Sequence, residues 1–125
     1  MAAYNKFQRK WVSKPKVSIA KASLSPTVRD LEWAAGFLEG EGSFIRANSC
    51  KRGCEMISVP QKDSESLFRL QKLFGGNLST RPTAWGYRMN VWQVYGARAR
   101  GIMMTLFNLM SAGRQNQIKH ALIGD

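Results

Sequence analysis

The chain has 125 residues, which suits one domain built around a single hydrophobic core. Its 19 Lys and Arg residues against 8 Asp and Glu residues give a formal net charge of +11, which indicates a polyanionic partner, nucleic acid before membrane. No apolar stretch approaches the length of a membrane span, and the first residues lack the apolar core of a secretory signal. We therefore expect an intracellular protein without a membrane partner.

The N-terminal segment, residues 1–27, is strongly basic and has little core-forming pattern. Residues 1–29 contain seven Lys and Arg residues and no acid. Pro15 and Pro26 interrupt any long helix. We expect a flexible arm that contacts nucleic acid. A cleaved organelle transit peptide is the less favoured alternative, because the segment is rich in Lys rather than Arg.

Hairpins alternate with helices along residues 28–125, which we expect to form one domain. Thr27 is a good N-cap for a helix over residues 28–40, and Asp30 stands in the capping-box position. The later pattern predicts strands at 44–49, 56–60, 77–81 and 87–95, and helices at 64–74, 97–110 and 114–122. This order predicts an α+β fold, an αββαββα unit followed by a short fourth helix. Its four-stranded antiparallel sheet would have helices on one face and an open face for a ligand.

The two cysteines, Cys50 and Cys54, lie in the polar turn of the first predicted hairpin. A structural zinc site needs four ligands, and the single histidine, His120, is far away in the sequence. We therefore expect two free thiols in a reducing compartment.

Two glycines and two acids lie near the end of the first predicted helix. Gly36 and Gly40 share one helix face, and a glycine there costs about 0.5–1 kcal/mol relative to Ala. We expect this face, extended by Ala35, to pack closely against another backbone. Glu39 and Glu41 lie where the helix dipole disfavours anions. A bound cation and a solvated helix end both remain open as explanations.

The segment over residues 33–44, WAAGFLEGEGSF, resembles the LAGLIDADG motif in its W-L-A-G-F-x-D/E-G-E-G-S-F form, with Ala34 where Leu is usual. The resemblance continues through VPQKD at 59–63, Gly75-Gly76, WQVYG at 92–96 and residues 109–117. It covers about residues 28–122. Many relatives have one more residue before the first basic strand, which leaves the register of that strand open.

Resemblance to single-motif LAGLIDADG homing endonucleases implies an intron-encoded enzyme that hydrolyses double-stranded DNA at a long, pseudo-palindromic site. The acid at the eighth motif position binds metal in that family. Glu41 and the backbone carbonyl of Gly40 would therefore hold Mg²⁺, or another divalent cation such as Mn²⁺. Gln61 would orient the attacking water, and Arg114 would stabilise phosphate charge.

A single motif per chain implies a homodimer with Ala35, Gly36 and Gly40 at the interface. Contacts in the major groove would come from the sheet residues Arg46, Arg81, Arg88 and Gln93. Two alternatives remain: an RNA maturase that assists splicing of its own intron, and a non-catalytic DNA-binding protein on the same scaffold. The intact Glu41 favours the nuclease, because neither alternative needs a metal ligand.

Overall fold

The computed structural model describes residues 16–22, 25–48, 50 and 53–123. The strands are β1 (Lys16–Ala20), β2 (Ser43–Ala47), β3 (Cys54–Gln61), β4 (Gly76–Pro82) and β5 (Arg88–Tyr95). The helices are α2 (Val28–Glu41), α3 (Glu65–Phe74), α4 (Gly96–Leu106) and α5 (Ala112–Ile123), with a short 3-10 turn, η1 (Phe107–Leu109). None of the described helices has the length and apolar character that a membrane crossing requires.

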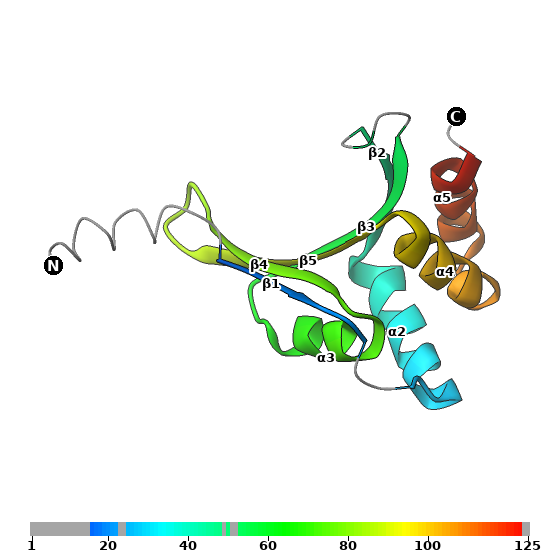
Figure 1. Ribbon diagram of the computed structural model, residues 1–125, viewed down its shortest axis with the longest axis horizontal. Helices are drawn as coiled ribbons and strands as arrows, with labels where there is room; N and C mark the ends of the chain where they lie inside the picture. The colour runs from blue at the N-terminus through cyan, green and yellow to red at the C-terminus, as the bar shows by residue number, and fades with distance from the viewer. Residues whose placement is uncertain (1–15, 23–24, 49, 51–52, 124–125) are drawn as a thin grey trace, which may run out of the picture.

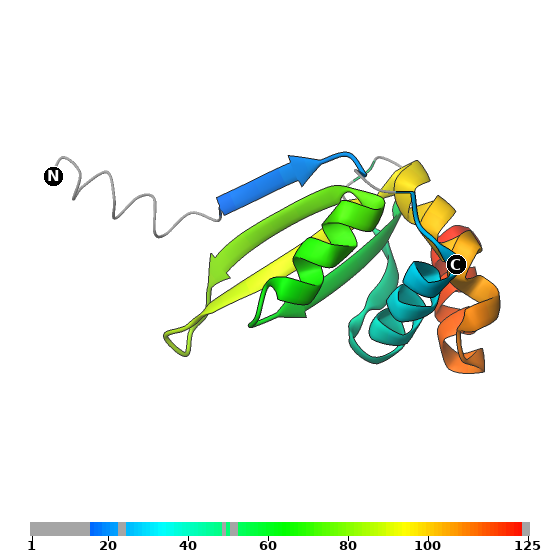
Figure 2. The same ribbon diagram turned by 90° about the horizontal axis from the view of Figure 1, so that it is seen from below.

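The strands form one antiparallel sheet in the order β1-β4-β5-β3-β2. β3 and β5 pair Ile57 with Val94 and Val59 with Trp92, which places these four buried side chains on one face. The helices cover that face, as Figure 1 and Figure 2 show from two directions. The predicted α+β class, with an antiparallel sheet and helices on one side, is confirmed.

A fifth strand, β1, extends the four-stranded sheet that the sequence predicted. It pairs with the edge of β4, from Lys16 opposite Thr80 to Ala20 opposite Gly76. Residues 16–20 therefore belong to the sheet, which corrects the expectation that all of residues 1–27 form a flexible arm. Val17 and Ile19 alternate with Lys16 and Ser18 as in a strand, but no hairpin partner stands beside this segment in the sequence, because its pairing comes from β4. Residues 1–15 lie outside the described residues.

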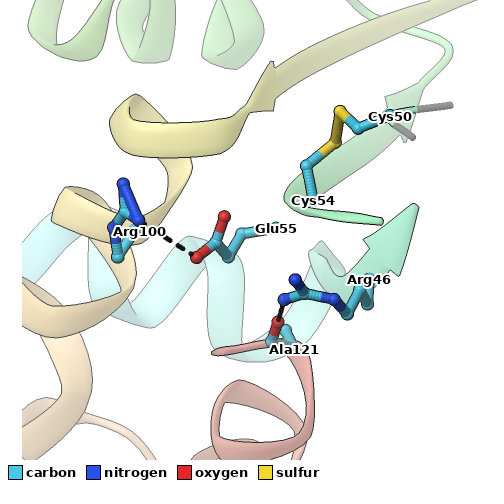
Figure 3. Close-up of a disulfide and its surroundings, with 6 residues drawn as sticks. All are labelled: Arg46, Cys50, Cys54, Glu55, Arg100 and Ala121. Carbon is cyan, nitrogen blue, oxygen red and sulfur yellow. Dashed lines mark hydrogen bonds and ion pairs between the residues drawn. A yellow bond between two sulfur atoms is a disulfide. The ribbon is translucent and has the colours of Figure 1, made fainter. Parts of the chain in front are cut away.

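The turn between β2 and β3 carries a disulfide between Cys50 and Cys54 (Figure 3). Gly53 has a φ of 81° and donates its N–H to the Cys50 carbonyl at 3.0 Å. This tight turn leaves the two cysteine Cα atoms 5.7 Å apart, within the range that a disulfide spans. The prediction of two free thiols was therefore wrong. The spacing gave no warning, because the pairing depends on the geometry of the turn.

Candidate active site

Glu41 and Gln61, the two predicted site residues at the ends of α2 and β3, are brought together by the fold. The Gln61 amide nitrogen donates a hydrogen bond to Oε1 of Glu41 at 2.9 Å. Glu41 is exposed and Gln61 is half-buried, so solvent and ligands reach the carboxylate. This exposed carboxylate, held by a neighbouring amide, is the centre of the candidate site.

The position of Glu41 depends on how α2 ends. Gly42 caps the helix by donating its N–H to the Leu38 carbonyl at 2.9 Å, and the chain then enters β2 directly. A Cβ atom at Gly42 would lie 3.0 Å from Cδ2 and 3.1 Å from the carbonyl oxygen of Leu38, closer than ordinary contacts allow. The missing side chain therefore lets the end of α2, with Glu41, approach its own last turn closely.

Glu39 and Arg114 tie the end of α2 to the start of α5. Oε1 of Glu39 accepts the backbone N–H of Ser111 at 2.9 Å. The backbone hydrogen bond from Ser111 is the main cause that lowers the pKa of Glu39, and the nearby Arg114 lowers it further. Arg114 Nε donates to the Glu39 carbonyl at 3.0 Å, and its Nη1 donates to Oε1 of Gln117 at 2.8 Å. These contacts hold the end of α2, which carries Glu41, against the start of α5.

Arg114 thus lies beside the candidate site, anchored to the carbonyl two residues before Glu41. Its guanidinium carbon is 6.0 Å from the centre of the Phe44 ring, at the start of β2. Sequence reasoning missed the contact between Glu39 and Ser111. The signal was present: an acid near a helix end can cap the N-terminus of a following helix, here the one that begins after Ser111.

The motif helix leaves a glycine face uncovered. Gly36 and Gly40 are exposed, and a Cβ atom added at either meets nothing within 4 Å. Ala35, by contrast, is 3% exposed and packs in the core with Ala34 and Leu38. The expected place of Ala35 in the interface is therefore wrong, because one residue further along a helix turns the side chain by about 100°.

Two of the four predicted DNA-contacting residues belong to the open face of the sheet. Trp92 is buried against the helices, so strand alternation places Gln93 on the opposite, open face. Leu78 pairs with Trp92 on the helix side, which likewise places Arg81 on the open face. Arg81 is exposed, as a groove contact requires.

Arg46 points the other way, which corrects its predicted role. Phe44 is buried against the helices, and alternation puts Arg46, two residues later, on the same face. Its Nη1 donates to the Ala121 carbonyl at 2.8 Å, near the C-terminus of α5 (Figure 3). Arg46 therefore stabilises the last carbonyls of α5. The register that the motif left open is the reason for the error.

Arg88 is four residues before Trp92 on β5, so alternation places both on the helix side of the sheet. The prediction had placed Arg88 on the open face. Arg88 lies at the start of β5, beside the β4–β5 turn, and its Nη2 donates to the Thr80 carbonyl at 3.4 Å.

Sequence reasoning also missed Glu55. This residue is 8% exposed on the helix side of β3, and Oε2 lies 3.5 Å from Nη1 of Arg100 on α4 (Figure 3).

The open face of β2 to β5 is mostly neutral. Gln93 links two other polar groups there: its amide nitrogen donates to Ser58 Oγ at 3.4 Å, and Tyr95 Oη donates to its Oε1 at 3.3 Å. Ile45 and Tyr95 are exposed apolar or aromatic members of this face. Among the side chains described on these four strands, Arg81 is the cation that alternation assigns to it.

The donor atoms at the end of α2 fit a hard divalent cation in type. The Glu41 carboxylate and the Gly40 carbonyl offer oxygen ligands, which Mg²⁺ prefers. They lie at the negative end of the α2 dipole, which favours a cation. Within the described residues, no group of three or more His, Cys, Asp or Glu could hold a metal ion.

Known proteins share parts of this sequence and geometry. No family model matches the chain. The chain is 29% identical over 105 residues to the intron-encoded RNA maturase bI4 of Saccharomyces cerevisiae, covering 84% of this chain and 15% of the maturase. It thus spans about one seventh of that relative's length.

The structure is similar to that of the homing endonuclease I-CvuI, crystallised with the I-CreI target and 2 mM Mg, in which the DNA is not cleaved. The TM-score is 0.50 at 18% identity, covering 76% of this chain and 69% of the other. The fold is therefore that of the homing endonucleases. With a LAGLIDADG-like motif, a LAGLIDADG homing endonuclease as fold neighbour and an intron-encoded maturase as relative, the findings are consistent with a LAGLIDADG-type protein.

Proposed function

We propose that this chain is a site-specific DNA endonuclease that acts as a homodimer and makes a staggered double-strand break. The observation that carries the proposal is the exposed Glu41 carboxylate, held by Gln61 at 2.9 Å at the end of the motif helix. An exposed acid at the negative end of a helix is unfavourable unless a cation or a protein donor compensates it. Gln61 compensates one carboxylate oxygen, and we infer that a cation bound between the other oxygen and a scissile phosphate compensates the rest.

The second chain supplies what one chain lacks. A two-fold dimer in which α2 packs against its copy would cover Gly36 and Gly40, where no atom lies within 4 Å of an added Cβ. It would bring two copies of Glu41 and of the Gly40 carbonyl near the axis. Two strands could then be cut by two equivalent sets of ligands.

Mg²⁺ or Mn²⁺ held by Glu41 and the Gly40 carbonyl would supply a water of lowered pKa and neutralise phosphate charge. The chain's own side chains do the rest. Gln61 keeps the Glu41 carboxylate in one orientation and offers its amide to the attacking water. Arg114, anchored at the Glu39 carbonyl, holds the end of α2 and adds positive charge near the phosphate. No histidine base is needed.

Double-stranded DNA with a long, pseudo-palindromic site is the proposed substrate. The formal charge of +11 supports a polyanionic ligand, and strands of the open sheet face would enter the major groove, which admits a two-stranded β-ribbon. Arg81 and Gln93 are its candidate base contacts. Gln pairs well with adenine and Arg with guanine, and apolar side chains such as Ile45 contact the thymine methyl group.

Glu41→Gln tests the proposal. A DNA site is first recovered by selection from a random library, and nicking and binding are then measured on that one duplex with Mg²⁺. We expect loss of cleavage with binding retained. Glu32→Gln, which removes an exposed acid elsewhere on α2, is the matched control and should cut normally. Near-normal cutting by Glu41→Gln contradicts the assignment of the metal ligand.

A second function, RNA maturation, is favoured by the sequence relative, which is an RNA maturase. The mostly neutral open face also suits contacts other than phosphate. A maturase should promote splicing of the transcript that flanks its coding sequence, and Glu41→Gln should leave that activity unchanged. A protein that binds the selected DNA but neither cuts it nor promotes splicing would fit the third alternative, a DNA-binding protein without catalysis.

A further inference from the structure

Trp85 stands in the turn between β4 and β5 and is 79% exposed. The other tryptophans of the described chain are covered: Trp92 is fully buried, and Trp33 stacks on Phe37 and carries the Arg69 guanidinium 3.9 Å above its ring. The turn extends beyond the helices, on the side of the molecule away from α4 and α5 (Figure 1 and Figure 2). Such exposure of the largest apolar side chain needs a reason.

The turn holds the backbone of Trp85 firmly. Thr83 donates its N–H at 3.0 Å and its hydroxyl at 2.7 Å to the Tyr87 carbonyl. The backbone N–H of Trp85 donates to the same hydroxyl at 3.3 Å. Gly86, with a φ of 87°, closes the turn in a conformation that other residues rarely adopt. The exposed ring is therefore carried by a well-bonded turn.

Basic residues lie at the strand ends next to this turn. Arg81 lies near the end of β4 and Arg88 at the start of β5, so both flank the turn. Lys62 follows β3, and its Nζ lies 4.6 Å from the centre of the Tyr87 ring. The acid next to Lys62 in sequence is Asp63, and its Oδ1 accepts the N–H of Glu65 at the start of α3. The turn that carries Trp85 is thus bordered by basic residues of β4 and β5.

We propose that Trp85 stacks on an unpaired nucleobase, and that Arg81, Arg88 and Lys62 contact the phosphates beside it. Every base has a π-face, so such stacking is tolerant of sequence, and it needs a base that is not already stacked in a duplex. The ligand is therefore a single-stranded segment, either an RNA loop or unpaired DNA. This contact goes beyond the proposed cleavage and does not involve Glu41.

The charge around Trp85 argues for a nucleic acid over an apolar protein surface. A protein that buried this ring would also have to desolvate the flanking cations, whereas phosphates pair with them. The interface of an anionic membrane has a similar chemistry, because Trp and basic residues gather there. Membrane binding is therefore a competing outcome of the test.

The test measures binding in EDTA, where cleavage cannot occur. The probes are a 12-nucleotide single-stranded DNA, the matching RNA and a blunt DNA duplex of the same sequence. Trp85→Ala should weaken binding to a single strand by about 5- to 150-fold, as expected for the loss of one stacked base. Trp85→Phe should retain much of the affinity. Leu109→Ala, which truncates an exposed apolar side chain in η1, is the matched control and should change nothing.

Two further readouts separate stacking from charge. Trp85→Ala should leave the salt dependence of binding unchanged, whereas Arg81→Gln should flatten its slope by about 0.7 on single strands. In a Trp11→Phe background, which removes the tryptophan of the basic N-terminal segment, the single strand should quench tryptophan fluorescence, and adding Trp85→Phe should abolish this quenching. Stronger binding to the RNA or to the DNA strand identifies the source of the unpaired base.

Any of three results overturns the proposal. Trp85→Ala could weaken binding to the duplex and to the single strand equally, or the single strand could still quench fluorescence when Trp85→Phe is present. The third is that Trp85 is needed for binding to phosphatidylserine vesicles and to none of the nucleic acids. Because Trp85 is exposed, its variants should melt at the wild-type temperature. The cleavage proposal fails separately, if Glu41→Gln still cuts duplex DNA.

Discussion

The carboxamide of Gln61 and the carboxylate of Glu41 meet at 2.9 Å, although the two residues are 20 apart in sequence and belong to a strand and a helix. The hydrogen bond fixes one carboxylate oxygen and leaves Glu41 exposed. A partner that orients a metal ligand in this way acts on the metal site through that ligand.

Gln61→Ala should therefore slow cleavage by about 10- to 100-fold. The concentration of Mg²⁺ that gives half-maximal cleavage should also rise, because the carboxylate is no longer held. DNA affinity in EDTA should not change. A variant with a normal Mg²⁺ dependence would show that the hydrogen bond between Gln61 and Glu41 has no role in metal binding.

Gly36→Leu should disrupt the dimer. A side chain at Gly36 meets no atom within 4 Å in the single chain, so the variant should fold, but it would block a second α2 helix. Light scattering on DNA should then report one protomer, and double-strand cutting should be lost even though Glu41 is present. Gly101→Leu, at an exposed glycine of α4 with equally open space, controls for the cost of a large side chain. Wild-type protein that cuts both strands as a monomer contradicts the two-fold arrangement.

Arg46 and Arg81 should respond in opposite ways to the same substitution. Arg46→Gln removes the guanidinium that caps the Ala121 carbonyl, so it should lower the melting temperature and speed hydrogen exchange at the end of α5. Its effect on the salt dependence of DNA binding should be small. Arg81→Gln should leave stability alone and weaken binding to the selected site by about 5- to 150-fold, as expected for the loss of one base contact. Equal effects on binding would return Arg46 to the DNA-contacting set.

Glu39 should make stability depend on pH. The N–H of Ser111 holds the pKa of Glu39 below its ordinary value in the folded state. A lowered folded-state pKa stabilises the protein above the unfolded pKa, and this contribution disappears as the pH falls through the folded pKa. Glu39→Gln should thus melt below the wild type at neutral pH, and the difference should vanish in acid. Melting curves from pH 7 down to about pH 3 cover the range.

The sequence predicted most of the α2 region, because its signals are local. The capping box of Thr27 and Asp30 formed as expected: the Asp30 N–H donates to Thr27 Oγ1 at 3.1 Å, and the Thr27 N–H donates to Asp30 Oδ2 at 2.9 Å. The motif also placed Glu41 and Gln61 at one site, because it indicates where the helix and the strand end. Neither inference needed the rest of the chain.

The errors concern side chains whose direction depends on distant partners. The face of β2 on which Arg46 lies depends on a register that one residue can invert. Ala35 turned inward because the core, not the glycine pattern, decides which side of α2 is buried. β1 pairs with β4, about 60 residues later in sequence, so no neighbouring segment indicated its partner.

The residues before β1 should add affinity without specificity. Residues 1–15 contain Lys6, Arg9, Lys10 and Lys14 and no acid. Deleting them should weaken binding to all duplexes alike and flatten the salt slope by about 0.9 for each phosphate that these cations neutralise. The check is binding to the selected site and to unrelated DNA across a range of KCl concentrations. Loss of specific binding alone, or an unchanged slope, contradicts this role.

The pairing of β1 with β4 also limits how far a truncation can go. Cutting after residue 15 keeps the hydrogen bonds from Lys16 opposite Thr80 to Ala20 opposite Gly76. Cutting after residue 24 removes these hydrogen bonds. The backbone N–H and C=O groups at the edge of β4 are then unpaired and can pair with strands of other molecules. The longer deletion should give a protein that aggregates during expression, so any loss of DNA binding by it would say little about charge.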